Sequence, residues 1–162
     1  MNPFFPDIKK NFGFGMMRLP MTGDLVDIPA TTKMVDTFME AGFNYFDTAH
    51  PYIQGQSETA LRECLTSRYP RNSYILANKL SAGCFETEEE IRPLFEKQLR
   101  QCGVEYFDFY LMHALSAKRH PMYQETRAYD IAQELKAEGK IRHVGMSFHD
   151  SAAVLDQILT DR

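Results

Sequence analysis

The sequence predicts an α/β fold built on a parallel sheet, of either the barrel or the doubly wound type. Apolar runs of strand length alternate five times with helical patterns. Within each run nearly every residue is apolar, instead of every second one, which is typical of parallel strands covered on both faces. No linker or break in composition interrupts the 162 residues, so we expect a single domain over 1–162.

The composition narrows the class of protein. The net charge of −4 provides no basic field, so we expect neither nucleic acid nor a membrane as a partner. Cys64, Cys84 and Cys102 are widely spaced and odd in number, which favours reduced thiols over a disulfide framework or a metal site. Together with the lack of a signal-peptide pattern, this predicts a cytoplasmic protein without a bound metal.

The first unit begins with the run FGFGMMRLP at 12–20, which predicts a short strand followed by a loop. The segment 31–42 places apolar residues at helical spacing. Thr31 or Thr32 is available as its N-cap, and Gly42 marks its end.

The second and third units follow the same order. The runs at 43–49 and 73–80 predict strands, and the segments at 57–68 and 87–103 predict helices. The later helix opens with a Thr-x-x-Glu capping box and ends at a glycine.

The last two units complete the alternation. We expect strands at 106–115 and 141–149 and helices at 124–140 and 150–162, the latter with an aspartate cap. The polar segment 116–123 contains one proline and predicts an exposed loop.

Polar residues stand at the carboxyl ends of the predicted strands. Asp47 ends the second strand, Lys79 the third, His113 the fourth and Ser147 the fifth, and Tyr52 lies in the loop after Asp47. Catalytic groups of βα barrels come from several strand ends on this one face. We therefore expect these side chains to meet at one edge of the sheet.

These residue types suit the polarisation of a carbonyl group. A partly desolvated Lys79 needs a counter-charge, which Asp47 offers, and an ammonium favours the phenolate form of a neighbouring phenol. Tyr52 could then give a proton to a carbonyl oxygen while His113 donates a hydrogen bond to it. A nicotinamide cofactor would supply the missing hydride.

Each of these residues also has an ordinary interpretation. Taken singly, Asp47 fits a turn, Tyr52 a packed rim aromatic, Lys79 a solvated strand end and His113 a structural histidine. Only their joint placement favours a site.

Weaker candidates lie nearby. His50 could line the pocket but fits an exposed loop better, and His149 fits a position before a helix cap. Asn78 fits a neighbour of the site no better than it fits an ordinary strand position. The Met pair 16–17 could be core filler.

The segments that contain these residues resemble the aldo-keto reductase family over essentially the whole chain. GFNYFDTAHPY is similar to the signature with the catalytic aspartate and tyrosine, and ILANKL and DFYLMHAL to the segments with the catalytic lysine and histidine. The resemblance thus implies catalytic roles for Asp47, Tyr52, Lys79 and His113. GMMRLP and SFHD resemble a bacterial subgroup whose members often carry a ferredoxin-like segment, which is not present here.

The resemblance also implies a cofactor, a substrate class and a barrel. It implies NADP(H) or NAD(H), held in part by Gly15, Met16, Met17, Asp47 and Ser147, and a small carbonyl compound as substrate. The family fold is a (β/α)8 TIM-type barrel, whereas this sequence predicts about five βα units, an incomplete barrel.

An alternative follows from this length. The chain could be a truncated, catalytically inactive fragment whose unpaired edge strands seek a second copy or a complementary C-terminal segment. It would then act as an oligomerising or interaction module.

Overall fold

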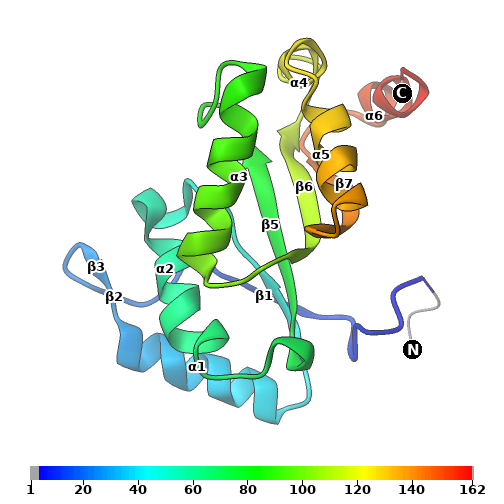
Figure 1. Cartoon of the computed structure of the whole chain (residues 1–162). Helices are drawn as coiled ribbons and strands as arrows, with labels where there is room; N and C mark the ends of the chain where they lie inside the picture. The colour runs from blue at the N-terminus through cyan, green and yellow to red at the C-terminus, as the bar shows by residue number, and fades with distance from the viewer. Residues whose placement is uncertain (1–3, 162) are drawn as a thin grey trace.

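Five parallel strands form the sheet at the centre of the molecule (Figure 1). The computed structural model describes residues 4–161. The strand order is β1–β4–β5–β6–β7, so neighbours in the sheet follow one another along the chain, as the βα alternation predicts. The bounds are Gly13–Gly15 for β1, Tyr45–Asp47 for β4, Ile75–Ser81 for β5, Phe107–Leu115 for β6 and Ile141–Phe148 for β7. A separate hairpin pairs β2 (Met21–Thr22) with β3 (Leu25–Val26).

Helices connect the strands, and Figure 1 shows α1, α2, α3 and α5 on one side of the sheet. The helices are α1 (Ile28–Glu40), α2 (Gln56–Leu61), α3 (Glu88–Cys102), α4 (His120–Glu125), α5 (Ala128–Ala137) and α6 (Ala152–Thr160). Shorter turns are η1 (Tyr52–Gly55), the π-helical η2 (Arg62–Thr66) and η3 (Arg71–Ser73).

The predicted cap of the first helix is wrong. Helix α1 begins at Ile28, and its N-cap is Asp27, whose carboxylate accepts the Ala30 N–H at 2.9 Å. Pro29 then falls in the first turn, where its missing N–H costs no hydrogen bond. Thr31 is buried inside the helix instead of capping it.

The cap of the last helix also differs. Ser151, not Asp150, caps α6, because the Asp150 carboxylate accepts the N–H groups of Ala117 and Ser151. The helix ends at Thr160, and Arg162, where it was expected to end, lies outside the described residues.

The expected exposed loop at 116–123 is partly helical. Helix α4 begins at His120 and buries His120 and Tyr123. Pro121 falls in the first turn, where proline is tolerated, and one and a half turns are too short to show helical periodicity. The helix expected over 124–140 consequently begins only at Ala128, after Arg127 with a left-handed φ of 52°.

The core lies between the sheet and the helices, and it only partly follows the expected covering of both faces. Every residue of β5 is buried, as expected for a central parallel strand. Strand β7 is mostly half-buried or exposed, because among the described residues it has a strand neighbour on one side only. No helix within residues 4–161 has the length and apolarity needed to span a membrane.

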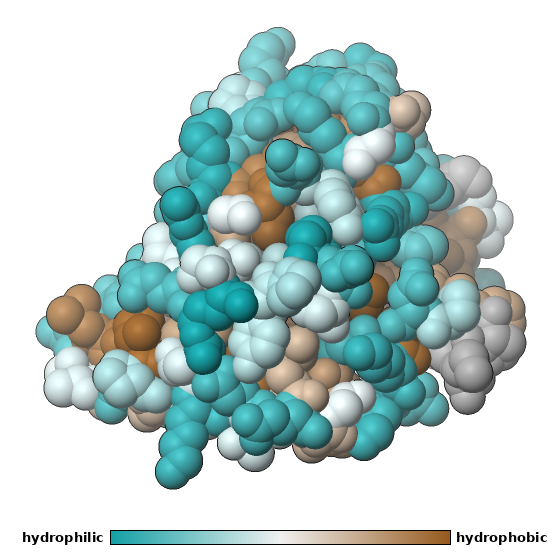
Figure 2. Space-filling model, turned by 60° about the horizontal axis from the view of Figure 1, so that its bottom comes forward, coloured by the Kyte–Doolittle hydropathy of each residue, from teal (hydrophilic) through white to brown (hydrophobic). Residues whose placement is uncertain are grey.

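Figure 2 shows a lower face that is mainly hydrophilic, with an apolar patch on its left. The hairpin β2–β3 occupies that side in Figure 1 and exposes Met21 and Leu25. Other exposed apolar surface lies beside β1, at Phe12 and Met34.

Candidate active site

The predicted polar residues meet at the carboxyl end of the sheet. Asp47 ends β4, Lys79 lies near the end of β5, and His113 and Ser147 lie near the ends of β6 and β7. Parallel strands place these ends on one edge, where ligands of α/β folds bind.

Lys79 and Asp47 form an ion pair at this edge. The Lys79 ammonium donates to Asp47 Oδ1 at 2.5 Å and to the Thr48 carbonyl oxygen at 2.8 Å. Lys79 is only 4% exposed. A buried ammonium needs such partners to stay charged at low cost, so the predicted role of Asp47 as the partner of Lys79 agrees with the geometry.

Tyr52 lies over this ion pair. Its ring centroid is 4.7 Å from Lys79 Nζ, and its hydroxyl is 3.5 Å from His113 Nε2. The turn that positions it is strained, because Ile53 and Gln54 both adopt left-handed φ angles of 50° and 54°. Each such residue costs about 1–2 kcal/mol, which packing of the surrounding loop must offset.

His113 is held neutral. Its Nδ1 lies 2.6 Å from Ser81 Oγ. Partial burial, helped by the positive charges of Lys79 and Arg119 and by the nearby His149, lowers the pKa of His113 to about 4. At neutral pH a neutral imidazole therefore faces Tyr52.

A cavity of about 430 Å3 opens beside these groups, within the size range of small-ligand sites. Tyr52 and His113 line it, together with Met17, Pro51, Ser81, Ala82 and four residues that include Arg119 and His149. Among the residues the structure describes, no group of three or more His, Cys, Asp or Glu side chains is placed to hold a metal ion.

The residues assigned to a cofactor fall in different places. Met17 is 49% exposed and lines the cavity, whereas the Met16 side chain is fully buried in the core. A Cβ added at Gly15 would meet no atom within 4 Å, so the space above β1 is open. Ser147 Oγ accepts the Ala114 N–H at 2.7 Å, which leaves its hydroxyl proton to donate elsewhere.

Two weaker candidates face the helices instead of the cavity. His50 is 14% exposed at its side chain and contacts Glu58, so the expectation of an exposed loop histidine is wrong. Asn78 is fully buried and contacts the same Glu58.

Sequence reasoning missed Ser81 and Glu58. Ser81 lies two residues after Lys79 on the same strand, and this period of two places both side chains on one face. That spacing was the available signal. Glu58 is indistinguishable in sequence from an ordinary acidic residue in a first helical turn.

Comparisons with known proteins place the chain in a family. A model described as the aldo/keto reductase family matches residues 11–162. An oxidoreductase from Schizosaccharomyces pombe is 32% identical, over 86% of this chain and 47% of that protein. The NADH-specific methylglyoxal reductase of Escherichia coli is 30% identical, over 72% of this chain and 41% of that protein.

Solved structures share the fold. The holo form of an aldo-keto reductase from Bacillus halodurans matches with a TM-score of 0.73 at 30% identity, over 92% of this chain and 49% of that one. A Klebsiella pneumoniae aldo-keto reductase in complex with NADPH also gives a TM-score of 0.73, at 23% identity.

The chain spans about half the length of the relatives it matches. The structural likeness confirms the predicted fold class, a TIM-type barrel represented here by five parallel strands with alternating helices. Because the family model matches nearly every residue, the chain belongs to the aldo/keto reductase family.

Proposed function

We propose that this chain contributes the proton-donating part of an NAD(P)H-dependent reductase of aldehydes or ketones. The observation that supports it is the convergence of a phenol, an ammonium ion, a carboxylate and a neutral imidazole beside one cavity. Tyr52 gives its proton to the carbonyl oxygen as negative charge develops there.

The other three groups assist Tyr52. The Lys79 ammonium stabilises the charge left on the phenol oxygen, and Asp47 holds that ammonium in place. His113 fixes the carbonyl oxygen by a hydrogen bond from Nε2, which a neutral ring can donate if Nδ1 accepts from Ser81.

A nicotinamide ring fits the open side of the cavity. Gly15 leaves room for a flat group above β1, Met17 offers an apolar contact, and the Ser147 hydroxyl retains a proton for an amide oxygen. The cofactor, NADP(H) or NAD(H), supplies hydride to the carbonyl carbon. The free thiols of Cys64, Cys84 and Cys102 are in keeping with a cytoplasmic protein.

Removal of the Tyr52 hydroxyl tests the proposal. NADPH and NADH are titrated by fluorescence, and turnover of a panel of aldehydes and ketones is then measured. Tyr52→Phe is expected to lower turnover at least about 100-fold, the usual contribution of a general acid, with cofactor affinity retained. Tyr69→Phe, which removes a hydroxyl that bonds Asp36 far from the cavity, is the matched control.

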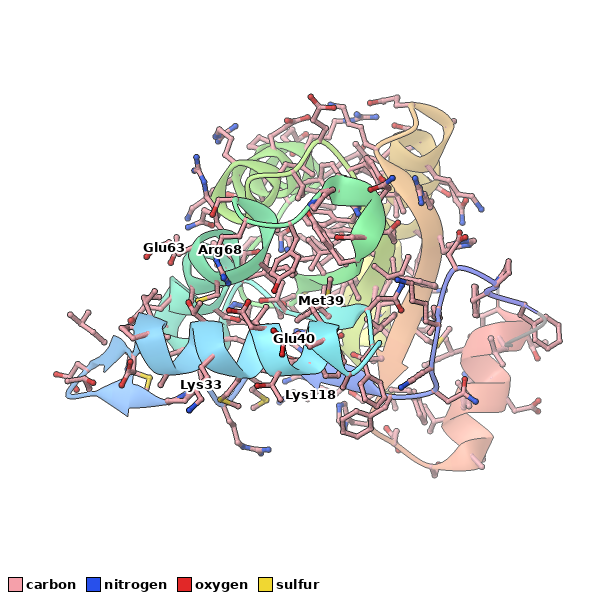
Figure 3. All side chains as sticks on the ribbon, turned by 90° about the horizontal axis from the view of Figure 1, so that it is seen from below. Lys33, Met39, Glu40, Glu63, Arg68 and Lys118 are labelled. Carbon is pink, nitrogen blue, oxygen red and sulfur yellow. The ribbon has the colours of Figure 1, made fainter. Side chains whose placement is uncertain are left out.

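A second candidate function rests on a different observation. An apolar groove of about 570 Å3 lies between β1 and α1 and includes Phe12, Phe14, Met34 and Phe38. Figure 3 shows Lys33, which also lines the groove, on the side of α1 away from Arg68. We infer that this groove is a surface for association, which a second copy of the chain or a complementary C-terminal segment covers.

The same titration separates the two functions. A folded chain that binds neither cofactor at millimolar concentration would contradict the reductase proposal for this chain alone. Association through the groove would then remain as the proposed function of the chain.

A further inference from the structure

A chain of buried polar side chains lies behind Lys79, on the helix side of β5. Glu58, Asn78, Gln98 and Tyr110 are all 0% exposed. Asn78 Nδ2 donates to Glu58 Oε1 at 2.8 Å, and Tyr110 donates to Gln98 Oε1 at 2.6 Å. Four polar side chains in an otherwise apolar layer are costly unless each is satisfied.

This chain satisfies the main chain of Lys79. Strand β4 ends at Asp47, which pairs with Ala77, so β4 offers no partner two residues farther along β5. Instead, the Lys79 N–H donates to Asn78 Oδ1 at 2.8 Å, and Gln98 Nε2 donates to the Lys79 carbonyl at 2.9 Å. Side chains therefore make the hydrogen bonds to the Lys79 main chain that β4, which has already ended, does not make.

The contacts fix the direction of each hydrogen bond. Asn78 Oδ1 already accepts from Lys79 and from Gln98 at 3.2 Å, so the Asn78 amide nitrogen must be the group that meets Glu58. Glu58 Oε2 lies 2.7 Å from His50 Nδ1. His50 Nε2 lies 3.3 Å from the Lys97 ammonium, which can only donate, so the His50 proton sits on Nδ1.

We propose that Glu58, oriented by His50, is a positioning residue for Lys79. Its carboxylate fixes the Asn78 amide, and that amide fixes the main chain from which the Lys79 ammonium extends beneath Tyr52. The inference rests on the proposed reductase function for its effect on turnover, but the hydrogen-bond directions can be measured without substrate or cofactor.

Glu58→Gln tests the proposal by NMR of 15N-labelled protein. In the wild type, the 15N shifts of His50 should show a protonated Nδ1. In the variant, the glutamine carbonyl keeps the bond to Asn78 and its NH2 group faces His50, so the proton should move to Nε2 while the exposed Lys97 ammonium turns away into solvent. The Lys79 amide resonance should shift, because a neutral carbonyl holds the Asn78 amide more weakly than a carboxylate does. Glu63→Gln, which removes an exposed charge from the same helical segment, should move neither signal.

Turnover provides the second measurement. Glu58→Gln is expected to lower kcat on the order of tenfold with the aldehyde KM unchanged, because the weaker bond to Asn78 holds Lys79 less firmly and this acts on the chemical step. A wild-type His50 protonated on Nε2, or an unmoved Lys79 resonance in a folded Glu58→Gln variant, would overturn the inference. Absent turnover with the expected NMR changes would count only against the reductase function.

Discussion

The Lys79 ammonium is nearly removed from water, and Asp47 is its only carboxylate partner among the ion pairs within residues 4–161. Removal of one member of a buried pair leaves an uncompensated charge, which costs more than the pair itself contributes. Asp47→Asn is therefore expected to lower the free energy of unfolding by about 3 kcal/mol in urea at pH 7. The double variant Asp47→Asn, Lys79→Met should recover part of this loss.

An exposed ion pair supplies the control for the Asp47→Asn variant. Glu134 bonds Arg92 at 2.7 Å on the helix surface, and such pairs contribute about 1 kcal/mol or less. If Asp47→Asn cost no more than Glu134→Gln, the idea that Asp47 compensates a buried charge would be wrong.

His113 makes stability depend on pH in a defined window. Its folded-state pKa is about 4, whereas an unfolded histidine titrates near 6.5, so the unfolded chain binds more protons between these values. Stability should therefore fall as the pH drops from about 6.5 to about 4. His113→Asn should lessen this fall by on the order of 1 kcal/mol, because solvent at the half-exposed ring screens part of the effect.

Urea unfolding at pH 7, 5.5 and 4.5 measures the difference, and an NMR titration of the wild-type ring checks its cause. Identical pH dependence of the two proteins would show that His113 titrates normally.

At this scale the sequence was informative where a residue of suitable chemical type stands at the end of a predicted strand. Asp47, Lys79 and His113 could be placed on one edge because each ends an apolar run, and parallel strands align their ends. Ser81 and Glu58 could not be found in this way. Their importance depends on which side chains the fold brings to them from other strands and helices, which spacing along the chain does not specify.

At the scale of elements, the turns and caps differ most from expectation. The five strands were predicted in the right order, because continuous apolar runs are a strong signal. Helix α4 was missed, since its two buried residues, His120 and Tyr123, are only three apart within a polar segment. A short helix of this kind is specified by what it packs against, not by its own pattern.

Tyr123 shows what α4 contributes. Its buried hydroxyl accepts the Ala82 N–H at 3.0 Å and lies 2.8 Å and 3.0 Å from the carbonyl oxygens of Leu80 and His113, which share its one proton. Burial raises the pKa of Tyr123 to about 12, so the hydroxyl keeps its proton at neutral pH. The helix thereby ties the ends of β5 and β6 together directly beside the cavity.

Tyr123→Phe should therefore destabilise the protein by about 1–3 kcal/mol, because it leaves buried main-chain groups unsatisfied. Thermal or urea unfolding measures the loss. Tyr69→Phe removes a hydroxyl whose partner Asp36 is open to solvent and should cost less. Equal losses in the two variants would mean that Tyr123 does not hold the strand ends.

At the scale of the whole molecule, the five-stranded sheet determines both where the candidate site lies and which strand edges are unpaired. The strands β1 and β7 each pair on one side only within the described residues, and β7 is mostly half-buried or exposed. The candidate proton donor lies in η1, just after β4, and its neighbours Asp47, Lys79 and His113 come from β4, β5 and β6, away from both edges. The proton-donating groups can therefore be assembled by these five strands alone.

The apolar groove beside β1 predicts concentration-dependent association of the 162-residue chain. Light scattering across a dilution series should show species larger than a monomer. Met34→Lys places a charge in this groove, where Met34 is 43% exposed, and should shift the distribution toward monomer. Leu25→Lys, at an exposed apolar residue of the β2–β3 hairpin, should leave it unchanged. A wild-type chain that stays monomeric at every concentration would contradict association through the groove, and an equal effect of both variants would show that apolar surface in general, rather than this groove, drives it.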